Sequence, residues 1–386
     1  MKVCGIIAEF NPFHLGHKFL IDSVKKDFDA VVCIISGNIV QRGELSVIDR
    51  ALKTQIALDS GVDLVLELPL PFSALSAEKF ASRGVYILDS LQIIDNLAFG
   101  IQTKDTNLLT KVAKLGNTDE VKTLIEAKVR ENIGYPIAFE EVIKEKLQLN
   151  STDIFKKGNN ILALEYLSAL DKFNSKIEPY FVYRDDNNFP SAKEIRKKMM
   201  SGEDIKKYMP DFAYNRLQTE IDKGNAPVSL NQFERVFMAI LRQLKIEDIK
   251  NAPDVVGGLE NRIKDVIENS DNIKQVIEKS SSNIFTHSRI KRALVCACLK
   301  INKDDASQMP TYIKVLGHSQ KGRQILSNIQ NTCKLPIVMK TADVKKLPSY
   351  SRRIYEINAK GDDLYNLFVP KLKPCNTYYR ENIIVK

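Results

Sequence analysis

The sequence predicts an α/β fold: a doubly wound parallel sheet of the Rossmann type, followed by a basic and mostly helical C-terminal domain. Apolar, β-branched runs recur about every 30 residues in the first hundred positions, which is the length of one βαβ unit. These runs are apolar at nearly every position, as in strands that helices cover on both faces. The 386 residues exceed one ordinary core, so we expect two domains, 1–200 and 201–386.

The expected elements follow the chain in order. Strands should end near Ala8, Ser36, Glu67 and Phe99, with helices between them over 17–28, 48–60 and 73–91. A fifth strand is expected over 179–184, then a loop over 185–190 and a helix that begins near Ser191. Residues 105–175 and 228–300 have helical periodicity. Two shorter runs, 312–316 and 336–339, resemble strands.

The positive charge is concentrated in the second half of the chain. Residues 1–100 hold 9 basic and 12 acidic residues, whereas residues 201–386 hold 31 basic and 21 acidic ones, out of a total net charge of +9. A basic domain beside a nearly neutral one favours a polyanionic partner such as RNA. The alternative is a basic surface that only keeps the protein in solution, and charge alone does not separate the two.

Other features narrow the class of protein. No apolar run approaches the roughly 20 residues that cross a bilayer, and the first residues lack the pattern of a signal peptide. The cysteines show neither paired spacing nor a CxxC metal motif; they are Cys4, Cys33, Cys296, Cys298, Cys333 and Cys375. We therefore expect a cytoplasmic protein without a membrane segment or a protein-bound metal.

Two of the four histidines lie directly after the first predicted strand. His14 and His17 open the first helix at the spacing i, i+3, which brings side chains to the same side of a helical turn. In an open parallel sheet, ligands bind beyond the carboxyl ends of the strands, where a helix N-terminus favours phosphate. We expect both imidazoles to be catalytic and to donate hydrogen bonds to phosphate oxygens, with Gly16 leaving room for close approach. The alternative is a histidine pair that caps the helix or packs in the core.

The segment from Glu9 to His17 resembles the nucleotidyltransferase superfamily, whose (H/T)xGH signature binds the phosphates of ATP. It is more closely similar to the tRNA(Met) cytidine acetate ligase family. Further segments share this likeness across nearly the whole chain: 36–38, 41–44, 67–69, 98–100, 159–162, 183–184, 289–292, 315–317 and 321–323.

The resemblance implies an enzyme that activates acetate with ATP to acetyl-AMP, with Mg²⁺ accompanying the ATP. The acetyl group then passes to N4 of the wobble cytidine of elongator tRNA(Met), forming N4-acetylcytidine. It also implies an ATP site that includes Gly100, Asn159 and Arg184. The remaining implied contacts form the loop Ile7, Ala8, Glu9, Phe10, Asn11, Pro12, Phe13, His14, Leu15, Gly16, His17, Lys18, Phe19 and Leu20.

Each of the three outlying ATP contacts has a structural alternative. Gly100 is also explained as an ordinary glycine at a strand end. Asn159 suits the N-cap of a helix that starts before Ile161. Arg184 is also explained by a surface ion pair with the aspartates that follow it.

Further phosphate or substrate contacts are expected near the second and fifth strands. Asn38 and Arg42 follow the second strand, with plain turn chemistry as the alternative. The superfamily usually has a Ser-x-Thr-x-x-Arg-like motif after its fifth strand, and here Lys193 replaces the hydroxyl residue between Ser191 and Arg196. Lysine still binds phosphate as a point charge, so we keep all three as candidates.

The C-terminal half offers candidate RNA contacts, because lysine and arginine pair with RNA phosphates. The candidates are Arg289, Lys291, Arg292, Lys321 and Arg323. Solvated basic faces are the alternative, and we expect His287 and His318 to be structural. Two other functions remain open at this stage: a small-molecule nucleotidyltransferase, or a non-catalytic RNA-binding protein with a vestigial nucleotide site.

Overall fold

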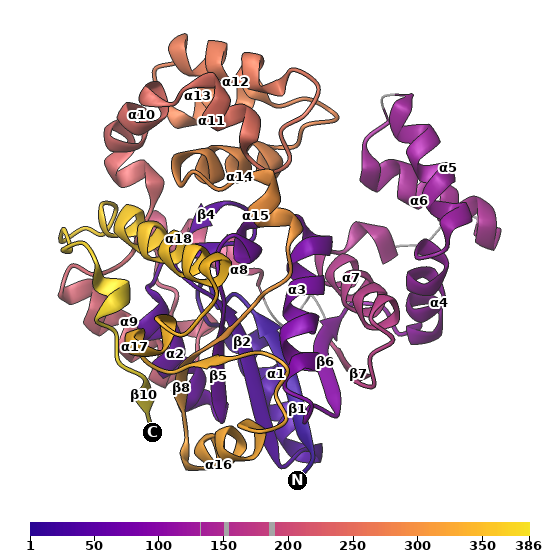
Figure 1. Cartoon of the computed structure of the whole chain (residues 1–386), viewed down its shortest axis with the longest axis vertical. Helices are drawn as coiled ribbons and strands as arrows, with labels where there is room; N and C mark the ends of the chain where they lie inside the picture. Colours follow the sequence, from indigo (N-terminus) through magenta and orange to yellow (C-terminus); the bar gives the residue numbers. More distant parts are fainter. Residues whose placement is uncertain (132, 150–153, 185–189) are drawn as a thin grey trace.

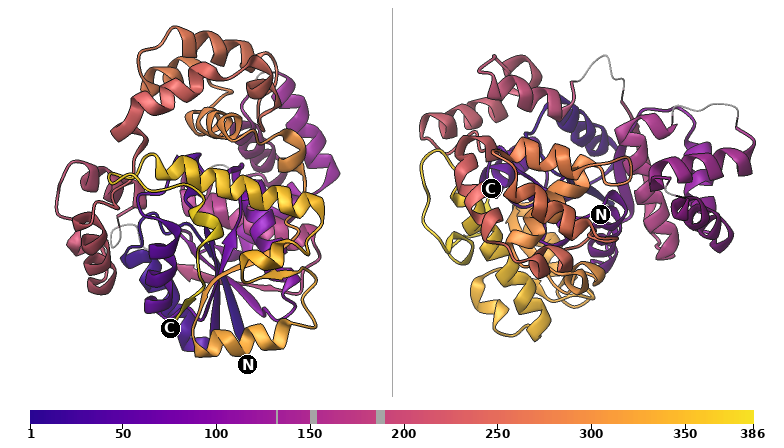
Figure 2. Two further views of the ribbon diagram at one scale, coloured as in Figure 1. Left: turned by 60° about the vertical axis from the view of Figure 1, so that its left-hand side comes forward. Right: turned by 90° about the horizontal axis from the view of Figure 1, so that it is seen from above.

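A computed structural model describes residues 1–131, 133–149, 154–184 and 190–386 of the chain. A central sheet runs through the molecule with helices on both of its faces (Figures 1 and 2). The strand order is β10-β8-β5-β2-β1-β6-β7, with β9 paired to β8. This arrangement confirms the predicted α/β fold with a mostly parallel sheet.

The first five long strands of the chain form the parallel part of the sheet. Their order in the sheet, third, second, first, fourth, fifth, is that of the first five strands of a Rossmann fold. They are β1 Val3–Ala8, β2 Ala30–Ser36, β5 Leu64–Leu68, β6 Asn96–Ile101 and β7 Glu178–Tyr183. All four pairings among them are parallel, so their carboxyl ends meet along one edge of the sheet, called here the carboxyl edge.

Alternate residues of each strand pack into two separate cores. In β2, Val32 and Ile34 belong to one core, while Cys33 and Ile35 belong to the other. Every residue of β2 is buried as a result, which explains the uninterrupted apolar runs. One core lies under α1 Leu15–Asp27, α2 Arg50–Ser60, α8 Ala192–Met200 and α9 Asp211–Asp222; the other lies under α3 Ala77–Ser90 and α7 Gly158–Lys172.

Two helical groups extend past the carboxyl edge, on the side away from the N-terminus (Figure 1). One is α4 Thr106–Gly116, α5 Asp119–Arg130 and α6 Tyr135–Leu147. The other is α10 Glu234–Gln243, α11 Ile246–Asn251, α12 Leu259–Glu268, α13 Ile273–Ser280 and α14 His287–Cys298. These helices confirm the helical character expected for residues 105–175 and 228–300.

The last part of the chain returns to the sheet. Strand β8, Ile313–His318, pairs antiparallel with β5 and in turn carries β9 Ile337–Val338 and β10 Ile384–Val385. Helices α15 Lys303–Ser307, α16 Gln320–Ile329, α17 Thr341–Val344 and α18 Ser349–Asn366 surround these strands. The shorter elements are β3 Ile39–Val40, β4 Glu44–Leu45 and the 3₁₀ turns Phe72–Ala74, Ile154–Lys156, Lys206–Tyr208, Leu230–Phe233 and Thr377–Tyr379.

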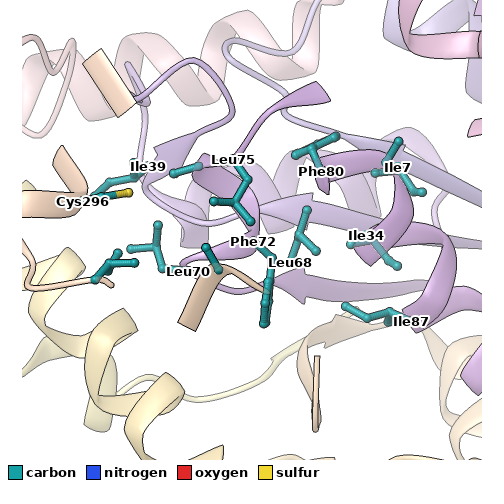
Figure 3. Close-up of a cluster of buried hydrophobic side chains, with 14 of the residues drawn as sticks. Ile7, Ile34, Ile39, Leu68, Leu70, Phe72, Leu75, Phe80, Ile87 and Cys296 are labelled. Atoms are coloured by element: carbon teal, nitrogen blue, oxygen red, sulfur yellow. The ribbon is translucent and has the colours of Figure 1, made fainter. Parts of the chain in front are cut away.

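One hydrophobic core therefore contains side chains from both sides of residue 200. Figure 3 shows Cys296 of α14 beside Ile39 of β3, and both belong to the same buried cluster as Leu70. The expected division into 1–200 and 201–386 stays a prediction, but the sheet and this core both cross that boundary.

A buried set of charged side chains also joins the two parts of the chain. Arg50 of α2 is 1% exposed and contacts Glu67 of β5 at 3.1 Å, Asp362 of α18 at 2.8 Å, and Glu381. Tyr378 donates a hydrogen bond to Glu67 at 2.7 Å. The arginine thus connects the carboxyl edge of the sheet to three positions in the last 25 residues. Within the described residues, no helix is both long and apolar enough to span a bilayer.

Candidate active site

The two histidines of the predicted motif form a stacked pair where α1 begins. His14 is the N-cap of α1, and its Nδ1 accepts a hydrogen bond from the Gly16 amide at 3.0 Å. The Nδ1 atom of His17 accepts one from the His14 amide at 3.2 Å. The ring centroids lie 3.8 Å apart with 27° between the planes. His14 therefore caps the helix, as the structural alternative expected, while the catalytic role of the pair stays a prediction.

This arrangement fixes where the two imidazoles carry their protons. Because Nδ1 is an acceptor in each ring, the neutral tautomer places the hydrogen on Nε2. Burial, together with the nearby Arg184, lowers the pKa of His14 to about 3. Burial, followed by His14 and Arg184, lowers the pKa of His17 well below its usual value. Both rings are therefore neutral at pH 7, and each has one Nε2–H group to donate.

Most amides of the first turn are used inside the turn. Gly16 donates to His14, and the amides of His17 and Lys18 both donate to the His14 carbonyl. Among the described residues, the Leu15 amide has no hydrogen-bond partner. The imidazole Nε2–H groups and this one amide are the donors that remain for a phosphate.

Gly16 lies under both His14 and Arg184. A Cβ atom on Gly16 would lie 2.9 Å from Cε1 of His14 and 3.2 Å from Cζ of Arg184. Arg184 follows β7, its amide donates to Ile101 of β6 at 2.8 Å, and its guanidinium donates to the Pro190 carbonyl at 3.1 Å. The structure thus brings Arg184 to the histidine pair. Its expected alternative partners, Asp185 and Asp186, lie outside the described residues.

The loop between β1 and α1 is held from several sides. Phe10 has a positive φ of 48°, and its ring lies 5.0 Å from the rings of both Phe13 and His17. The side-chain oxygen of Asn11 accepts a hydrogen bond from the Val47 amide at 2.9 Å. Arg196 of α8 donates to the Asn11 carbonyl at 2.8 Å. The candidate Arg196 therefore supports the loop directly.

Lys53 also holds this loop in place. It was not among the site residues predicted from the sequence. Its ammonium is 0% exposed and donates to the backbone carbonyls of Glu9 at 3.3 Å, Ser36 at 2.8 Å and Gly37 at 2.6 Å. Burial lowers the pKa of Lys53 to about 7, against the opposing effect of Glu9. This one side chain ties the end of β1 to the end of β2.

Gly100 and Asn159 lie along the carboxyl edge on the other side of β1. A Cβ atom on Gly100 would have only the Val182 carbonyl within 4.0 Å, so the backbone there is open to a ligand. Asn159 lies in the first turn of α7 and is not its N-cap, which is Lys157. The neighbouring Asn160 accepts a hydrogen bond from the Gln102 amide at 2.7 Å and joins α7 to the end of β6. Asn160 was not among the site residues predicted from the sequence.

Asn38 and Arg42, the two candidates after β2, differ in their surroundings. Asn38 is buried, accepts from the Arg50 amide at 2.7 Å, and donates to Asp362 at 2.9 Å. Both polar groups of its amide are bonded within the protein, so its position fits the turn alternative rather than a substrate contact. Arg42 is exposed at the carboxyl edge, close enough to lower the pKa of Glu44 together with the larger effect of Lys291.

Ser191 and Lys193 lie at the start of α8. Ser191 caps the helix, because its hydroxyl accepts from the Glu194 amide at 3.2 Å while the Glu194 carboxylate accepts from the Ser191 amide at 2.7 Å. Lys193 is exposed in the first turn. Its place at a helix N-terminus is compatible with phosphate contact, but its side chain contacts none of the loop residues described above.

The cations of α14 reach the carboxyl edge, although all three have protein partners. Lys291 contacts Glu44 at 2.7 Å, and Arg292 contacts Asp254 at 2.9 Å. Arg289 donates to the Asp254 carbonyl at 2.8 Å. Part of the predicted basic surface is therefore used for contacts within the protein.

Lys321 and Arg323 lie at the opposite, amino edge of the sheet. Lys321 donates to the carbonyl of Asp29, which directly precedes β2, at 2.5 Å. Figure 1 shows α16 near the N-terminus, below the strands. A strand of six residues separates the two edges by roughly 20 Å, so these cations cannot share a compact site with the histidine pair.

Within the described residues, no group of three or more His, Cys, Asp or Glu side chains could hold a metal ion. Cys296, part of the C-x-C run, packs in the core, and burial raises the pKa of its thiol to about 12.

The comparisons with known proteins agree with this geometry. The HIGH Nucleotidyl Transferase family matches the chain over residues 1–379. A relative named tRNA(Met) cytidine acetate ligase in Thermoanaerobacter sp. (strain X514) is 34% identical over 95% of both chains. Another of that name, in Acetivibrio thermocellus, is 31% identical over all of both chains.

This chain belongs to the tRNA(Met) cytidine acetate ligase family. A relative in Caldanaerobacter subterraneus subsp. tengcongensis is 35% identical over 95% of both chains. The crystal structure of Thermotoga maritima TmcAL bound with alpha-thio ATP covers the whole of both chains with a TM-score of 0.94 at 27% identity. Because these matches run the full length, family membership applies to the sheet and the helical groups together.

Proposed function

We propose that this chain is an ATP-dependent ligase that joins acetate to N4 of the wobble cytidine of elongator tRNA(Met). The observation that supports it most directly is the stacked, neutral pair of His14 and His17 at the carboxyl edge. Members of the family carry the name tRNA(Met) cytidine acetate ligase, and a structural relative was crystallised with an ATP analogue.

In the first step, an acetate oxygen attacks the α-phosphorus of ATP, and pyrophosphate leaves to give acetyl-AMP. The transition state needs donors for the phosphate oxygens and screening of the attacking carboxylate. The Nε2–H groups of His14 and His17 donate to the phosphates, and Arg184 supplies positive charge beside them. The open backbone at Gly100 and the first turn of α7 with Asn159 accommodate the nucleoside.

In the second step, the N4 amine of cytosine attacks the acetyl carbonyl, and AMP leaves with the bonding electrons. This step depends on bringing the amine against the acyl phosphate. The wobble base must first be unstacked from its loop. Exposed Arg42 and the cations of α14 form the side of the carboxyl edge on which the RNA approaches in this proposal.

The proposal includes Mg²⁺ bound to the triphosphate. The loop from Ile7 to Leu20 contains one carboxylate, Glu9, and Asp22 follows it on α1. Burial raises the pKa of Glu9, and Asp22 forms an ion pair with Lys18 on α1. Neither is a free ligand for a protein-held ion, whereas ATP-bound Mg²⁺ keeps its waters and phosphate oxygens.

The test is ATP–pyrophosphate exchange with and without acetate, followed by mass analysis of nucleosides from added tRNA(Met). We expect acetate-dependent exchange and N4-acetylcytidine with the parent, and a loss of at least about 100-fold in exchange with His14→Ala or His17→Ala. Exchange that ignores acetate but responds to a phosphorylated metabolite would favour the small-molecule nucleotidyltransferase. RNA binding without any turnover would favour the vestigial site.

A further inference from the structure

A pocket lies between β4, α8 and the helical group α10–α14. Its volume is about 430 Å³, which is within the range of small-ligand pockets. It is lined by β4, α8, α13, α14 and the segment 228–231. The lining includes neither histidine of the pair nor Arg184, so this pocket is distinct from the proposed ATP site.

Arg196 connects the pocket to the ATP loop. It lines the pocket, donates to the Asn11 carbonyl at 2.8 Å, and contacts Glu44 at 3.2 Å. Lys291 of α14 contacts the other oxygen of Glu44 at 2.7 Å. A ligand in the pocket would therefore touch the group that holds the loop from which His14 and His17 project.

The charges of the lining favour an anion. Four cations line the pocket, and two carboxylates oppose them, Glu44 and Glu278. Glu44 is shared by two of the cations, and Glu278 lies 3.9 Å from Lys274, whose side chain is 81% exposed. Lys197 is exposed and has no ion-pair partner among the described residues. Lysines in this arrangement suit phosphates that remain partly in water.

Part of the pocket lining is apolar. Ile273 and Val228 are buried, and Leu230 and Ile277 line the same space. Asn231, also in the lining, adds an amide that can donate to and accept from a base edge. An apolar slot with lysines at its rim matches a nucleobase on its phosphate backbone, and single-stranded RNA loops present such unstacked bases.

We infer that this pocket binds an unstacked nucleotide of the RNA substrate that flanks the reacting cytidine. The inference rests on the proposed function, because it assigns part of the same RNA a place beside the acetyl-transfer site. The reacting cytidine itself must reach the acyl phosphate at the histidine pair, which lies outside this pocket. Arg196 both lines this pocket and supports the ATP loop, so RNA bound here contacts a residue of the neighbouring ATP site.

Two variants test the pocket, one that fills it and one that reverses its rim charge. Ile277→Trp places a large ring in the pocket, and Lys274→Glu changes an exposed side chain whose pair with Glu278 is on the surface at 3.9 Å. Lys176→Glu is the matched control, since Lys176 is exposed in a different pocket at the amino edge. For each variant, acetate-dependent ATP–pyrophosphate exchange and tRNA acetylation at low RNA concentration are measured together.

We expect exchange to stay within twofold of the parent in all three variants. The KM for tRNA should rise about tenfold in Ile277→Trp and Lys274→Glu and stay unchanged in Lys176→Glu. If both pocket variants acetylate tRNA with the parent's KM, the pocket assignment is wrong while the proposed function stands. If the parent itself shows no acetate-dependent exchange and no acetylated cytidine, the proposed function fails.

Discussion

His14 illustrates how one residue takes both a structural and a chemical task at this site. Its Nδ1 caps α1 while its Nε2 keeps a proton to donate. The cap holds the ring in one tautomer, and burial holds it neutral. A lysine or arginine at this position would supply charge but no acceptor for the Gly16 amide. Histidine does both, because one ring nitrogen accepts the hydrogen bond of the cap and the other can donate one to a ligand.

The depressed pKa of His14 predicts a specific loss of stability in acid. Its pKa is about 3 in the folded protein and about 6.5 when unfolded. The unfolded chain therefore takes up a proton first as the pH falls below 6.5, so the stability due to the neutral ring is complete above 6.5 and is lost toward pH 3. Between pH 6.5 and 4.5, the free energy of unfolding of the parent should fall by up to about 1.4 kcal/mol per pH unit more than that of His14→Gln.

Urea unfolding at several pH values measures this difference. His17 remains in both proteins, and because burial is the largest cause of its lowered pKa, most of its contribution cancels in the comparison. Parallel stability curves for the parent and the variant would show that His14 is not held neutral.

Lys53→Met tests whether the buried ammonium positions the loop. Three backbone carbonyls would lose their donor, and unsatisfied buried groups cost about 1–3 kcal/mol each. We expect a free energy of unfolding lower by about 3 kcal/mol and a higher KM for ATP in the exchange reaction. Lys122→Met is the control, because Lys122 forms only an exposed pair with Asp119 and should change stability by less than about 0.5 kcal/mol. A stable Lys53→Met enzyme with the parent's KM would contradict the positioning role.

At the scale of elements, the turn between β3 and β4 depends on Gly43 for its contact with α14. Gly43 has a φ of 67°, and a Cβ atom there would lie 2.5 Å from the Arg292 amide nitrogen and 2.7 Å from the Lys291 carbonyl carbon. Both the backbone conformation and the close approach exclude a side chain. This contact holds Glu44 where Lys291 and Arg196 meet it.

Comparing Gly43→Ala with Gly202→Ala separates the effect of the positive φ from the effect of the close contact with α14. Gly202 has a φ of 75° but nothing within 4 Å of a Cβ atom. We expect Gly202→Ala to cost about 1 kcal/mol from the backbone alone and Gly43→Ala to cost at least about 3 kcal/mol, because backbone of α14 must shift as well. Thermal and urea unfolding give both values. Equal losses of stability in the two variants would show that the contact with α14 does not add to the cost at Gly43.

The elements that the sequence predicted well are those with a local signal. The parallel strands appear as apolar runs because both faces are buried, and the loop after β1 carries its histidines at a readable spacing. The pairing of β8 with β5 has no such signal, since Glu67 and Lys314 lie opposite each other but are far apart in the chain. Lys53 resembles an ordinary solvent-facing lysine in a helix until its three carbonyl partners are placed around it.

At the scale of the whole molecule, the last 80 residues complete the first domain. β8 covers the edge of β5, which would otherwise present unpaired backbone groups to water. Asp362 and Glu381 neutralise Arg50, whose burial at 1% exposure depends on them. The helical group α10–α14 is thus an insertion between two parts of one sheet, rather than a separate module that follows it.

A fragment of residues 1–200 should therefore fail to fold as a stable unit. It would remove Asp362 and Glu381, two of the three carboxylates that pair with Arg50, and leave Glu67 as the remaining one. It would also leave β5 as an unpaired edge strand and remove the part of the hydrophobic core that contains Cys296. We expect the fragment to show no cooperative urea transition by circular dichroism and no protection by ATP. A chain lacking only α10–α14, with 234–298 replaced by a short linker, keeps β8, Asp362 and Glu381 and should retain a cooperative transition. If instead the 1–200 fragment unfolds cooperatively and binds ATP, the first domain closes at residue 200 and the returning strands are dispensable.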